Sequence, residues 1–392
     1  MKKLLSILLT LALLVGMSSM ALADTITLKV WGAQDDQALL NTLVEQFKAE
    51  NPDHDWDISF GVVGEPDAKT RYLEDPAQAA DVFAFANDQL IDLVNADALY
   101  EVTIDKDAII AANGAGAIES ATLNDELYGY PMSADNGYFL YYDKSVLTEE
   151  DVLTLDGMLA KAGEAGKSVF MDVSNGWYIA SFFLGAGCTL TLDEDGNQVC
   201  DFNNETGAKV GEAISAFTAN PAFLTGDDTV LQGGMGDTIC AGVSGTWNAE
   251  AMKEKLGDNY AATKLPSFTV DGEQVQMGSF IGTKIIGVNT QTQFPVEAMA
   301  LASFLTNEAA QIARFAARSI GPSNINAAAS EEVQADIALA ALAAQSPYGT
   351  SQKFVLGNYW GPAEAFGLEL ENRSDADIQG LLDALVAQVT AN

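Results

Sequence analysis

Residues 81–103 read DVFAFANDQLIDLVNADALYEVT, an apolar run that ends abruptly in polar residues and leads into a helical pattern. Phe83 and Phe85 lie in the apolar run, which predicts a buried strand, and Asn87 and Asp88 follow it. In an open α/β sheet, the residues just beyond the carboxyl end of a strand line the ligand crevice. We therefore expect Asn87 and Asp88 to line a crevice, and the same holds for Asp35 and Asp36.

The segments before this stretch show the same alternation of strand and helix. TITLKVWG (residues 25–32) alternates as a strand, and WDISFGVV (residues 56–63) predicts the next one. Between them, Asp35 and Asp36 mark a helix start, and apolar residues recur every three or four positions up to residue 47. This order predicts an α/β fold with a mostly parallel sheet flanked by helices.

A strand, a polar pair, an aromatic residue and a helix recur in this order further along the chain. Asn175 precedes Trp177, and Ser244 precedes Trp247. A flat aromatic face beside short polar side chains suits a sugar, which has an apolar ring face and a rim of hydroxyls. Packing in the core is the alternative for each of these aromatic residues.

The charge balance is strongly acidic, with 55 aspartates and glutamates, 19 lysines and arginines, and a net charge of −36. Nucleic acid and anionic membrane surfaces repel such a protein, so we expect neither as a partner. The composition is otherwise that of a globular protein, at 48% hydrophobic, and 392 residues suffice for about two domains.

The first 23 residues have the three parts of an export signal. Lys2 and Lys3 precede an apolar segment at residues 4–15, and Ala-Leu-Ala at residues 21–23 is a cleavage site. The apolar segment is shorter than the ~20 residues of a spanning helix, which argues against an uncleaved anchor. We expect cleavage after Ala23 and a soluble periplasmic or extracellular product without a lipid-bearing cysteine.

Three cysteines are present: Cys188, Cys200 and Cys240. Cys188 and Cys200 bracket two alternating strands around an acidic turn, which predicts a hairpin. A disulfide between them is our first interpretation, because an exported protein meets oxidising conditions. Pairing with Cys240 and free thiols are the alternatives.

The sequence offers little for catalysis. His54 is the single histidine, and neither a G-x-S-x-G elbow, a G-x-G-x-x-G fingerprint nor a P-loop is present. An acidic turn at residues 193–196 departs from a calcium loop, because its glycine falls at the fourth position instead of the sixth. We therefore expect no enzyme, cofactor or metal site, although a carboxylate pair for glycoside cleavage stays open.

Six stretches together resemble family 1 extracellular solute-binding proteins, the receptors of carbohydrate ABC importers, and among them the maltose-binding group. They are LKVWGAQDDQALLNTLVEQFKAENP, DVFAFANDQLIDLVNADALYEVT, LYGYPMSADNGYFLYYDKSVL, VSGTWNAEAM, YAATKLPSF and FLTNEAAQIARFAARSIGPSNINAA. The resemblance implies two α/β lobes that close on an oligosaccharide, with the permease subunits of an importer as partners and a monomeric receptor.

The resemblance also implies the lobe boundaries and the ligand-binding residues. The implied segments are residues 24–133 plus 284–322 for one lobe, 138–280 plus 323–392 for the other, and crossovers near 134–137, 281–283 and 321–323. The residues that match the group's ligand pattern are Asp35, Asp36, Phe85, Asp88, Asp135, Asn136, Asn175, Trp177, Tyr178, Trp247, Tyr359 and Trp360.

Four departures from the group's pattern concern the choice of sugar. The lysine expected near Asp36 is absent, and Gln89 replaces an arginine. Asn175 stands where a carboxylate is expected, and Phe85 where a tryptophan is expected. The resemblance therefore implies a maltodextrin receptor, with another oligosaccharide as an alternative ligand and a secreted glycoside-active enzyme as the alternative class.

Overall fold

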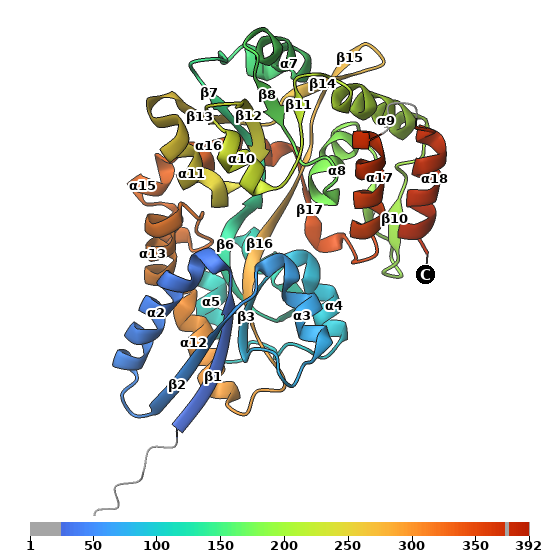
Figure 1. The fold of residues 1–392 in the computed structure, drawn as a ribbon. Helices are drawn as coiled ribbons and strands as arrows, with labels where there is room; N and C mark the ends of the chain where they lie inside the picture. Colours follow the sequence, from blue (N-terminus) through green and yellow to red (C-terminus); the bar gives the residue numbers. More distant parts are fainter. Residues whose placement is uncertain (1–24, 373–375, 392) are drawn as a thin grey trace, which may run out of the picture.

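Two β-sheets, each flanked by helices, organise the chain into two lobes (Figure 1). The computed structural model describes residues 25–372 and 376–391, so the predicted export signal lies outside the described residues. We call the six-stranded sheet with its helices the first lobe and the five-stranded sheet with its helices the second lobe.

The sheet of the first lobe has the strand order β17-β16-β3-β1-β2, and β6 pairs with β16 beside this path. β1 lies parallel to both β2 and β3, as the alternation of strands and helices predicts. The central strand β3 is buried along its whole length. The strands are β1 (Thr25–Gly32), β2 (Asp55–Val62), β3 (Val82–Ala86), β6 (Tyr130–Gly137), β16 (Ser279–Val288) and β17 (Gly349–Ser351).

Helices cover this sheet with their apolar sides. In α2, residues Leu40, Leu43, Val44 and Phe47 are buried, and their spacing places them on one helix face. A small hairpin of β4 (Thr122–Leu123) and β5 (Glu126–Leu127) precedes β6. The helices are α2 (Gln37–Glu50), α3 (Ala68–Glu74), α4 (Leu90–Asn95), α5 (Lys106–Ala112), α6 (Ala115–Ser120), α12 (Pro295–Leu305) and α13 (Glu308–Arg318).

The sheet of the second lobe has the order β11-β8-β12-β7-β13. Its strands are β7 (Phe139–Asp143), β8 (Ser168–Phe170), β11 (Phe223–Leu224), β12 (Ile239–Ser244) and β13 (Tyr260–Thr263), and two hairpins pair β9 (Leu190–Leu192) with β10 (Gln198–Cys200) and β14 (Ser267–Val270) with β15 (Glu273–Gln276). The remaining helices are α7 (Leu155–Glu164), α8 (Gly176–Gly185), α9 (Glu205–Thr218), α10 (Asp228–Gly234), α11 (Ala249–Leu256), α14 (Ile325–Ala328), α15 (Glu331–Gln334), α16 (Ile337–Gln345), α17 (Trp360–Asn372) and α18 (Ile378–Val389).

The antiparallel strands β6 and β16 run from one lobe into the other, and we call them the crossing pair (Figure 1). β16 contributes Ile285 to the hydrophobic core of the first lobe and Phe280 to that of the second lobe. Likewise, Tyr130 of β6 belongs to the first core, and Tyr138, which follows β6, belongs to the second. The predicted α/β fold with parallel strands is confirmed, and both sheets also contain antiparallel pairs.

The cysteines differ from the predicted disulfide. The hairpin of β9 and β10 forms as expected, but its register pairs Cys200 with Leu190, so Cys188 lies two residues away from the position opposite Cys200. Both are free thiols in the structure, as is Cys240, and all three are buried. Burial raises the pKa of the Cys200 thiol to about 11, which keeps it protonated and unreactive at neutral pH.

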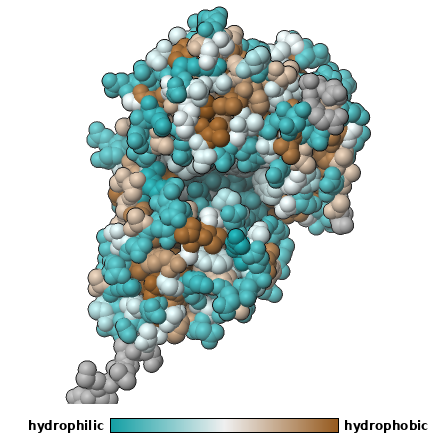
Figure 2. All heavy atoms as spheres, viewed as in Figure 1, coloured by the Kyte–Doolittle hydropathy of each residue, from teal (hydrophilic) through white to brown (hydrophobic). Residues whose placement is uncertain are grey.

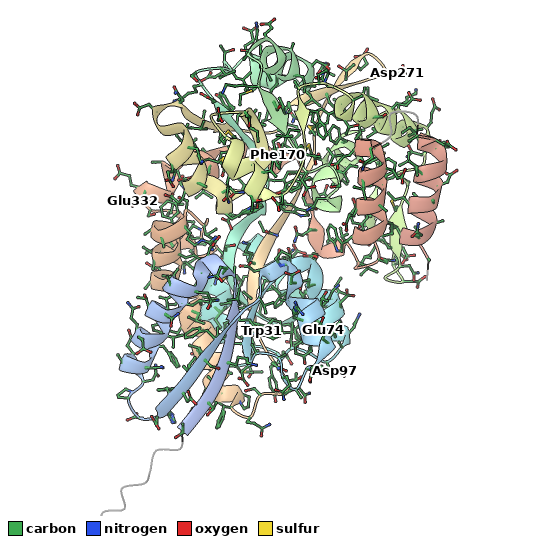
Figure 3. All side chains as sticks on the ribbon, viewed as in Figure 1. Trp31, Glu74, Asp97, Phe170, Asp271 and Glu332 are labelled. Carbon is green, nitrogen blue, oxygen red and sulfur yellow. The ribbon has the colours of Figure 1, made fainter. Side chains whose placement is uncertain are left out.

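The acidic surplus lies on the outer surface. Figure 2 shows hydrophilic residues over both lobes, and a hollow between the lobes that we call the cleft. Four labelled acidic residues lie on the periphery in Figure 3, and all are exposed: Glu74, Asp97, Asp271 and Glu332. Among the described helices, none combines the length and apolar character that crossing a membrane requires.

The end of α8 packs directly on backbone, and this contact gives a test of the fold. A Cβ atom added at Gly185 would lie 2.3 Å from the carbonyl oxygen of Gln276 and 2.6 Å from the backbone nitrogen of Gly278. We expect Gly185→Ala to destabilise the protein by roughly 1–3 kcal/mol, as overpacking does, with a lower melting temperature in calorimetry.

Gly163→Ala is the matched control, because Gly163 is an exposed residue of α7 with nothing within 4 Å of an added Cβ. There the alanine should stabilise the helix by up to about 1 kcal/mol. Equal melting temperatures for the two variants would contradict the packing of α8 on the segment before β16.

Candidate functional site

The strands β1, β3 and β12 each end in a short 3-10 helix that leads into an α-helix. These are η1 (Gln34–Asp36), η3 (Asn87–Gln89) and η5 (Thr246–Asn248). β1 and β3 are parallel neighbours, so η1 and η3 emerge at the same edge of the first sheet, which points toward the second lobe in Figure 1. This is the edge at which open α/β sheets bind ligands.

A chain of hydrogen bonds joins the two lobes beside this edge. The indole Nε1 of Trp177, at the start of α8, donates to Oε1 of Gln352 at 2.9 Å. The Nε2 atom of Gln352 donates to Oδ1 of Asp88 at 3.0 Å. The structure therefore brings together two of the predicted ligand residues, Asp88 and Trp177, through a glutamine that the sequence did not indicate.

The aromatic residues of the second lobe cluster around Trp177. Its ring centroid lies 4.5 Å from that of Tyr138, 5.3 Å from that of Tyr178 and 5.8 Å from that of Trp247. Trp177 and Trp247 are only half-buried, whereas Tyr178 is buried. The two indoles therefore offer partly exposed rings, and Tyr178 supports them from behind.

The indole of Trp247 is fixed by polar contacts. Its Nε1 donates to Oδ2 of Asp228 at 2.9 Å, and the hydroxyl of Ser244 donates to the other oxygen of that carboxylate at 3.2 Å. A cation faces the same ring, because Nζ of Lys284 lies 5.6 Å from its centroid. At this distance the ammonium interacts with the negative face of the ring.

Lys284 also connects this ring to the first lobe. Its Nζ lies 3.8 Å from Oε1 of Glu65, and both side chains are largely buried. Lys284 belongs to β16 of the crossing pair, and Glu65 begins η2 (Glu65–Asp67). A carboxylate of the first lobe and an indole of the second therefore share one ammonium group.

The acidic pair after β1 is held by an arginine of α13. Nη1 of Arg318 lies 2.5 Å from Oδ1 of Asp36, and its Nη2 lies 3.5 Å from Oδ2 of Asp35. Asp36 is buried and Asp35 is exposed. The negative charge of Asp36 is thus neutralised within the first lobe, and Asp35 is the freer of the two carboxylates.

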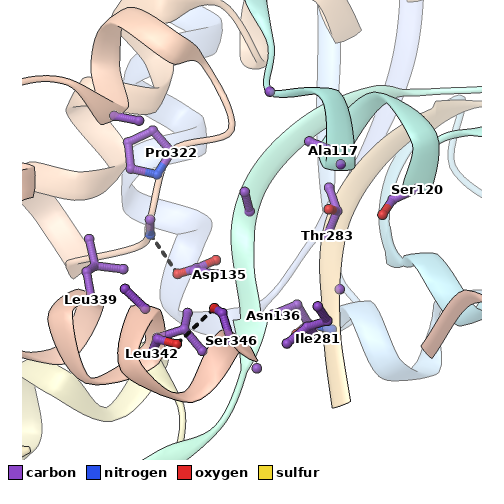
Figure 4. Close-up of a pocket in the computed structure, with 18 of the residues that line it drawn as sticks. Ala117, Ser120, Asp135, Asn136, Ile281, Thr283, Pro322, Leu339, Leu342 and Ser346 are labelled. Atoms are coloured by element: carbon purple, nitrogen blue, oxygen red, sulfur yellow. Dashed lines mark hydrogen bonds between the residues drawn. The ribbon is translucent and has the colours of Figure 1, made fainter. Parts of the chain in front are cut away.

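Asp135 and Asn136 lie in the crossing pair and line a cavity of about 550 Å³ between β6, β16 and α16 (Figure 4). Asp135 is buried, and its Oδ2 accepts from the hydroxyl of Thr246 at 2.5 Å and from the backbone N–H of Gly321 at 2.6 Å. Neither Trp177 nor Trp247 lines this cavity. Asp135 therefore ties the crossing pair to the turn before Trp247 and is not grouped with the indoles.

Two predicted ligand residues belong to the core instead. Phe85 is 0% exposed and belongs to the hydrophobic core of the first lobe, on a central strand with a paired neighbour on each side. Tyr359 is also 0% exposed, and its hydroxyl donates to the carbonyl oxygen of Gly176 at 2.9 Å. The interpretation of these two side chains as ligand contacts is therefore wrong for this structure.

The other two predicted residues have structural contacts. The side chain of Asn175 caps α8 by accepting from the backbone N–H of Trp177 at 3.0 Å. Trp360 begins α17 and is half-buried against Tyr359 and Phe280, with ring centroids 5.0 and 5.9 Å away.

Sequence reasoning missed three residues of the site: Gln352, Lys284 and Asp228. Lys284 had a signal, since it interrupts the apolar strand SFIGTKIIGV. Asp228 and Gln352 had none, because an acidic residue at a helix start and a glutamine in a loop are common features of surfaces.

Asp88 has a strongly shifted pKa. Burial raises its pKa to about 7, and Lys69 and the hydrogen bond from Gln352 partly oppose this shift. A strongly raised carboxyl pKa is typical of a functional site. Among the described residues, no group of three or more histidines, cysteines, aspartates or glutamates is arranged to hold a metal ion.

Comparison with known proteins gives the family. A sequence profile described as bacterial extracellular solute-binding protein matches residues 42–341. No curated protein matches the chain.

Several solved structures are similar over nearly their whole length. One, a structure with acarbose, is 32% identical, covers 94% of this chain and 99% of its own, and has a TM-score of 0.86. The maltodextrin-binding protein of L. casei BL23, without ligand, is 27% identical, with coverages of 94% and 100% and a TM-score of 0.79.

A Thermus thermophilus maltotriose-binding protein bound with maltotriose is 19% identical, covers 93% of this chain and 99% of its own, and has a TM-score of 0.79. At this identity the likeness shows the fold alone. The resemblance of the sequence to solute-binding receptors is confirmed, and the chain belongs to the family of bacterial extracellular solute-binding proteins.

Proposed function

We propose that this protein is the extracytoplasmic receptor of a carbohydrate ABC importer, and that it binds a maltodextrin-type oligosaccharide in the cleft. The observation that carries this proposal is the pair of half-buried indoles, Trp177 and Trp247, facing polar groups from both lobes. Aromatic rings stack on the apolar faces of sugars, while carboxylates and amides bond their hydroxyls.

The charges of the cleft support a neutral ligand. Its cations are paired with carboxylates: Lys284 with Glu65, Arg318 with Asp36, and Lys69 with Asp92. An anionic ligand would need cations that are free to face it. Paired charges instead supply many hydrogen-bonding atoms with little net charge, which suits a hydroxyl-rich sugar.

Lys284 and Arg318 also account for departures from the maltose-binding pattern. That pattern has a lysine near Asp36 and an arginine after Asp88, both absent here. Arg318 reaches Asp36 from α13, and Lys284 reaches the cleft from β16. The cations near these positions thus come from other elements, and each is paired with a carboxylate.

The likeness of the relatives supports the ligand class. The 32%-identical structure was solved with acarbose, and a 27%-identical relative is a maltodextrin-binding protein. We propose the same class of ligand for this chain, delivery to permease subunits by a monomeric receptor, and export after cleavage at Ala23. A receptor for a different oligosaccharide is the alternative ligand assignment.

We further propose that the lobes close by bending at the crossing pair, near residues 134–137 and 281–283, with another crossing near 321–323. The proposed lobes are residues 24–133 plus 284–322, and 138–280 plus 323–392. The separate hydrophobic cores support this division. Ser323 and Asn324 still bond to Gln311 of the first lobe, so the chain leaves that lobe just after them. β17, within residues 323–392, returns to the six-stranded sheet by pairing with the second-lobe end of β16.

A thermal-shift screen across mono- and oligosaccharides tests the proposal. Linear glucose oligomers should raise the melting temperature, since a ligand at 100 times its Kd stabilises the protein by about 2.7 kcal/mol. No shift with any maltodextrin, but a shift with another sugar, would favour the alternative receptor. Sustained release of reducing ends from maltodextrins would instead favour a glycoside-active enzyme.

Trp247→Ala tests the stacking role. If Trp247 stacks on a sugar ring, its loss should weaken binding by roughly 2 kcal/mol or more in calorimetric titration, as the loss of a central aromatic anchor does. The melting temperature of the unliganded variant should then change little.

Trp56→Ala is the matched control, because Trp56 is equally half-buried but lies in β2 of the first lobe. It should lower stability and leave affinity unchanged. If Trp247→Ala instead loses the roughly 3–5 kcal/mol of stability typical of a core truncation and binds sugar normally, Trp247 is not in the site.

A further inference from the structure

Gln352 occupies a position between the two walls of the cleft. It is the first residue of η8 (Gln352–Phe354), directly after β17, which pairs with β16 of the crossing pair. Its side chain is 2% exposed, although it is polar. Both ends of its amide are used, one by Trp177 of the second lobe and one by Asp88 of the first.

The chemistry of the partners fixes the orientation of this amide. The indole N–H of Trp177 can only donate, so Oε1 of Gln352 must face it. The Nε2 atom then faces Asp88, whose oxygen accepts at 3.0 Å. A flipped amide would turn its NH₂ group toward the indole N–H of Trp177 and its oxygen toward the carboxylate of Asp88. Only the observed orientation therefore pairs a donor with an acceptor at both partners.

Tight packing against the crossing pair holds the side chain in this place. A Cβ atom added at Gly282 of β16 would lie 2.9 Å from Cδ of Gln352 and 2.3 Å from Oδ1 of Asn87. The same Asn87 oxygen accepts from the backbone N–H of Thr283 at 3.2 Å. Gln352 therefore rests on the strand that connects the lobes, beside the residue that precedes Asp88.

We propose that Gln352 is a positioning residue of the sugar site, which holds the Asp88 carboxylate and the Trp177 indole in their ligand-binding orientations. The inference rests on the proposed function. Because Oδ1 of Asp88 accepts from Gln352, Oδ2 is the oxygen available to a sugar hydroxyl. Because Nε1 of Trp177 donates to Gln352, this hydrogen bond restrains the rotation of the indole.

The charges around Asp88 make this role measurable. Lys69 of α3 and Asp92 of α4 are the charged groups that act on it, and they form an ion pair with each other at 2.5 Å. Burial raises the pKa of Asp88 to about 7, and the donor from Gln352 opposes that rise. Removing the donor therefore raises this pKa further, and removing a hydrogen bond elsewhere does not.

The first experiment needs no sugar. In the unliganded protein, the carboxyl carbon of Asp88 is titrated by NMR, with Asp88→Asn used to assign its signal, and the indole N–H signal of Trp177 is followed. In Gln352→Met the pKa of Asp88 should rise, and the Trp177 signal should no longer respond to that titration.

Gln345→Met is the matched control. Gln345 is also a buried glutamine, but its amide bonds Leu265, Met277 and Ser279 of the second lobe. Its loss removes a buried amide of the same size and should leave both NMR signals unchanged. A purely structural glutamine at position 352 would behave like this control.

The second experiment measures sugar affinity against pH. A charged carboxylate accepts hydroxyls more strongly than a neutral one, so wild-type affinity should rise through pH 7, by up to about tenfold per pH unit below it. Gln352→Met should bind at least tenfold more weakly at pH 7, with the rise displaced to higher pH.

Gln352→Glu should reverse the pH dependence. A protonated glutamate presents a carbonyl to Trp177 and an O–H to Asp88, and so reproduces both contacts of the glutamine. Two adjacent carboxylates share one proton and lose it as pH rises. The sugar affinity of this variant should therefore approach that of wild type at low pH and fall as pH increases. If Gln352→Met does not fold, the pH profile of Gln352→Glu tests the positioning role in its place.

The outcomes separate the two proposals. If wild type binds no sugar, the proposed function fails, and the NMR titration still tests the link between Gln352, Asp88 and Trp177. If wild type binds sugar but Gln352→Met retains its affinity, its pH profile and the pKa of Asp88, the positioning role is overturned. A wild-type pH profile for Gln352→Glu would overturn it as well.

Discussion

The antiparallel pairing of β6 with β16 is the constraint on which the rest of the structure depends. These two strands connect the lobes. One end of each strand contributes side chains to the core of the first lobe, and core residues of the second lobe lie at or just after its other end. Three of the site residues are anchored in or against them. Lys284 is part of β16, Asp135 is part of β6, and Gln352 packs on Gly282.

This arrangement gives the two walls of the cleft a shared floor. A bend in the crossing pair would change the distance between Asp88 and the indoles without disturbing either hydrophobic core, because the cores lie on opposite sides of it. Lys284 and Arg318 are ion-paired there, which avoids the cost of unpaired buried cations. By contrast, Oδ1 of Asp135 and Nδ2 of Asn87 are buried without a hydrogen-bond partner. A ligand that adds contacts to both walls would favour the closed arrangement by its differential affinity.

The local features of the fold could be predicted from the sequence because they depend on neighbouring residues. The alternation in residues 25–32 and the buried run at 82–86 predict the strands that are observed. Asp88, Trp177 and Trp247, which were predicted as ligand residues, are grouped in the structure through Gln352 and the contact of the two indoles. Phe85 was misassigned because residues distant in sequence complete the core in which it is buried, including Ile285 of the neighbouring strand β16. The disulfide was misassigned because the register of the hairpin displaces the two cysteines by two residues.

Gln352 could not be predicted because its partners come from elements far apart in sequence, at a separation of 264 positions from Asp88. The most direct test of the account is small-angle X-ray scattering of the unliganded protein and of the protein saturated with the sugar that stabilises it most. The account predicts a smaller radius of gyration with sugar, since a ~10⁴-fold preference for the closed state moves a 1:99 population to 99:1. Saturation confirmed by calorimetry together with an unchanged scattering profile would contradict it.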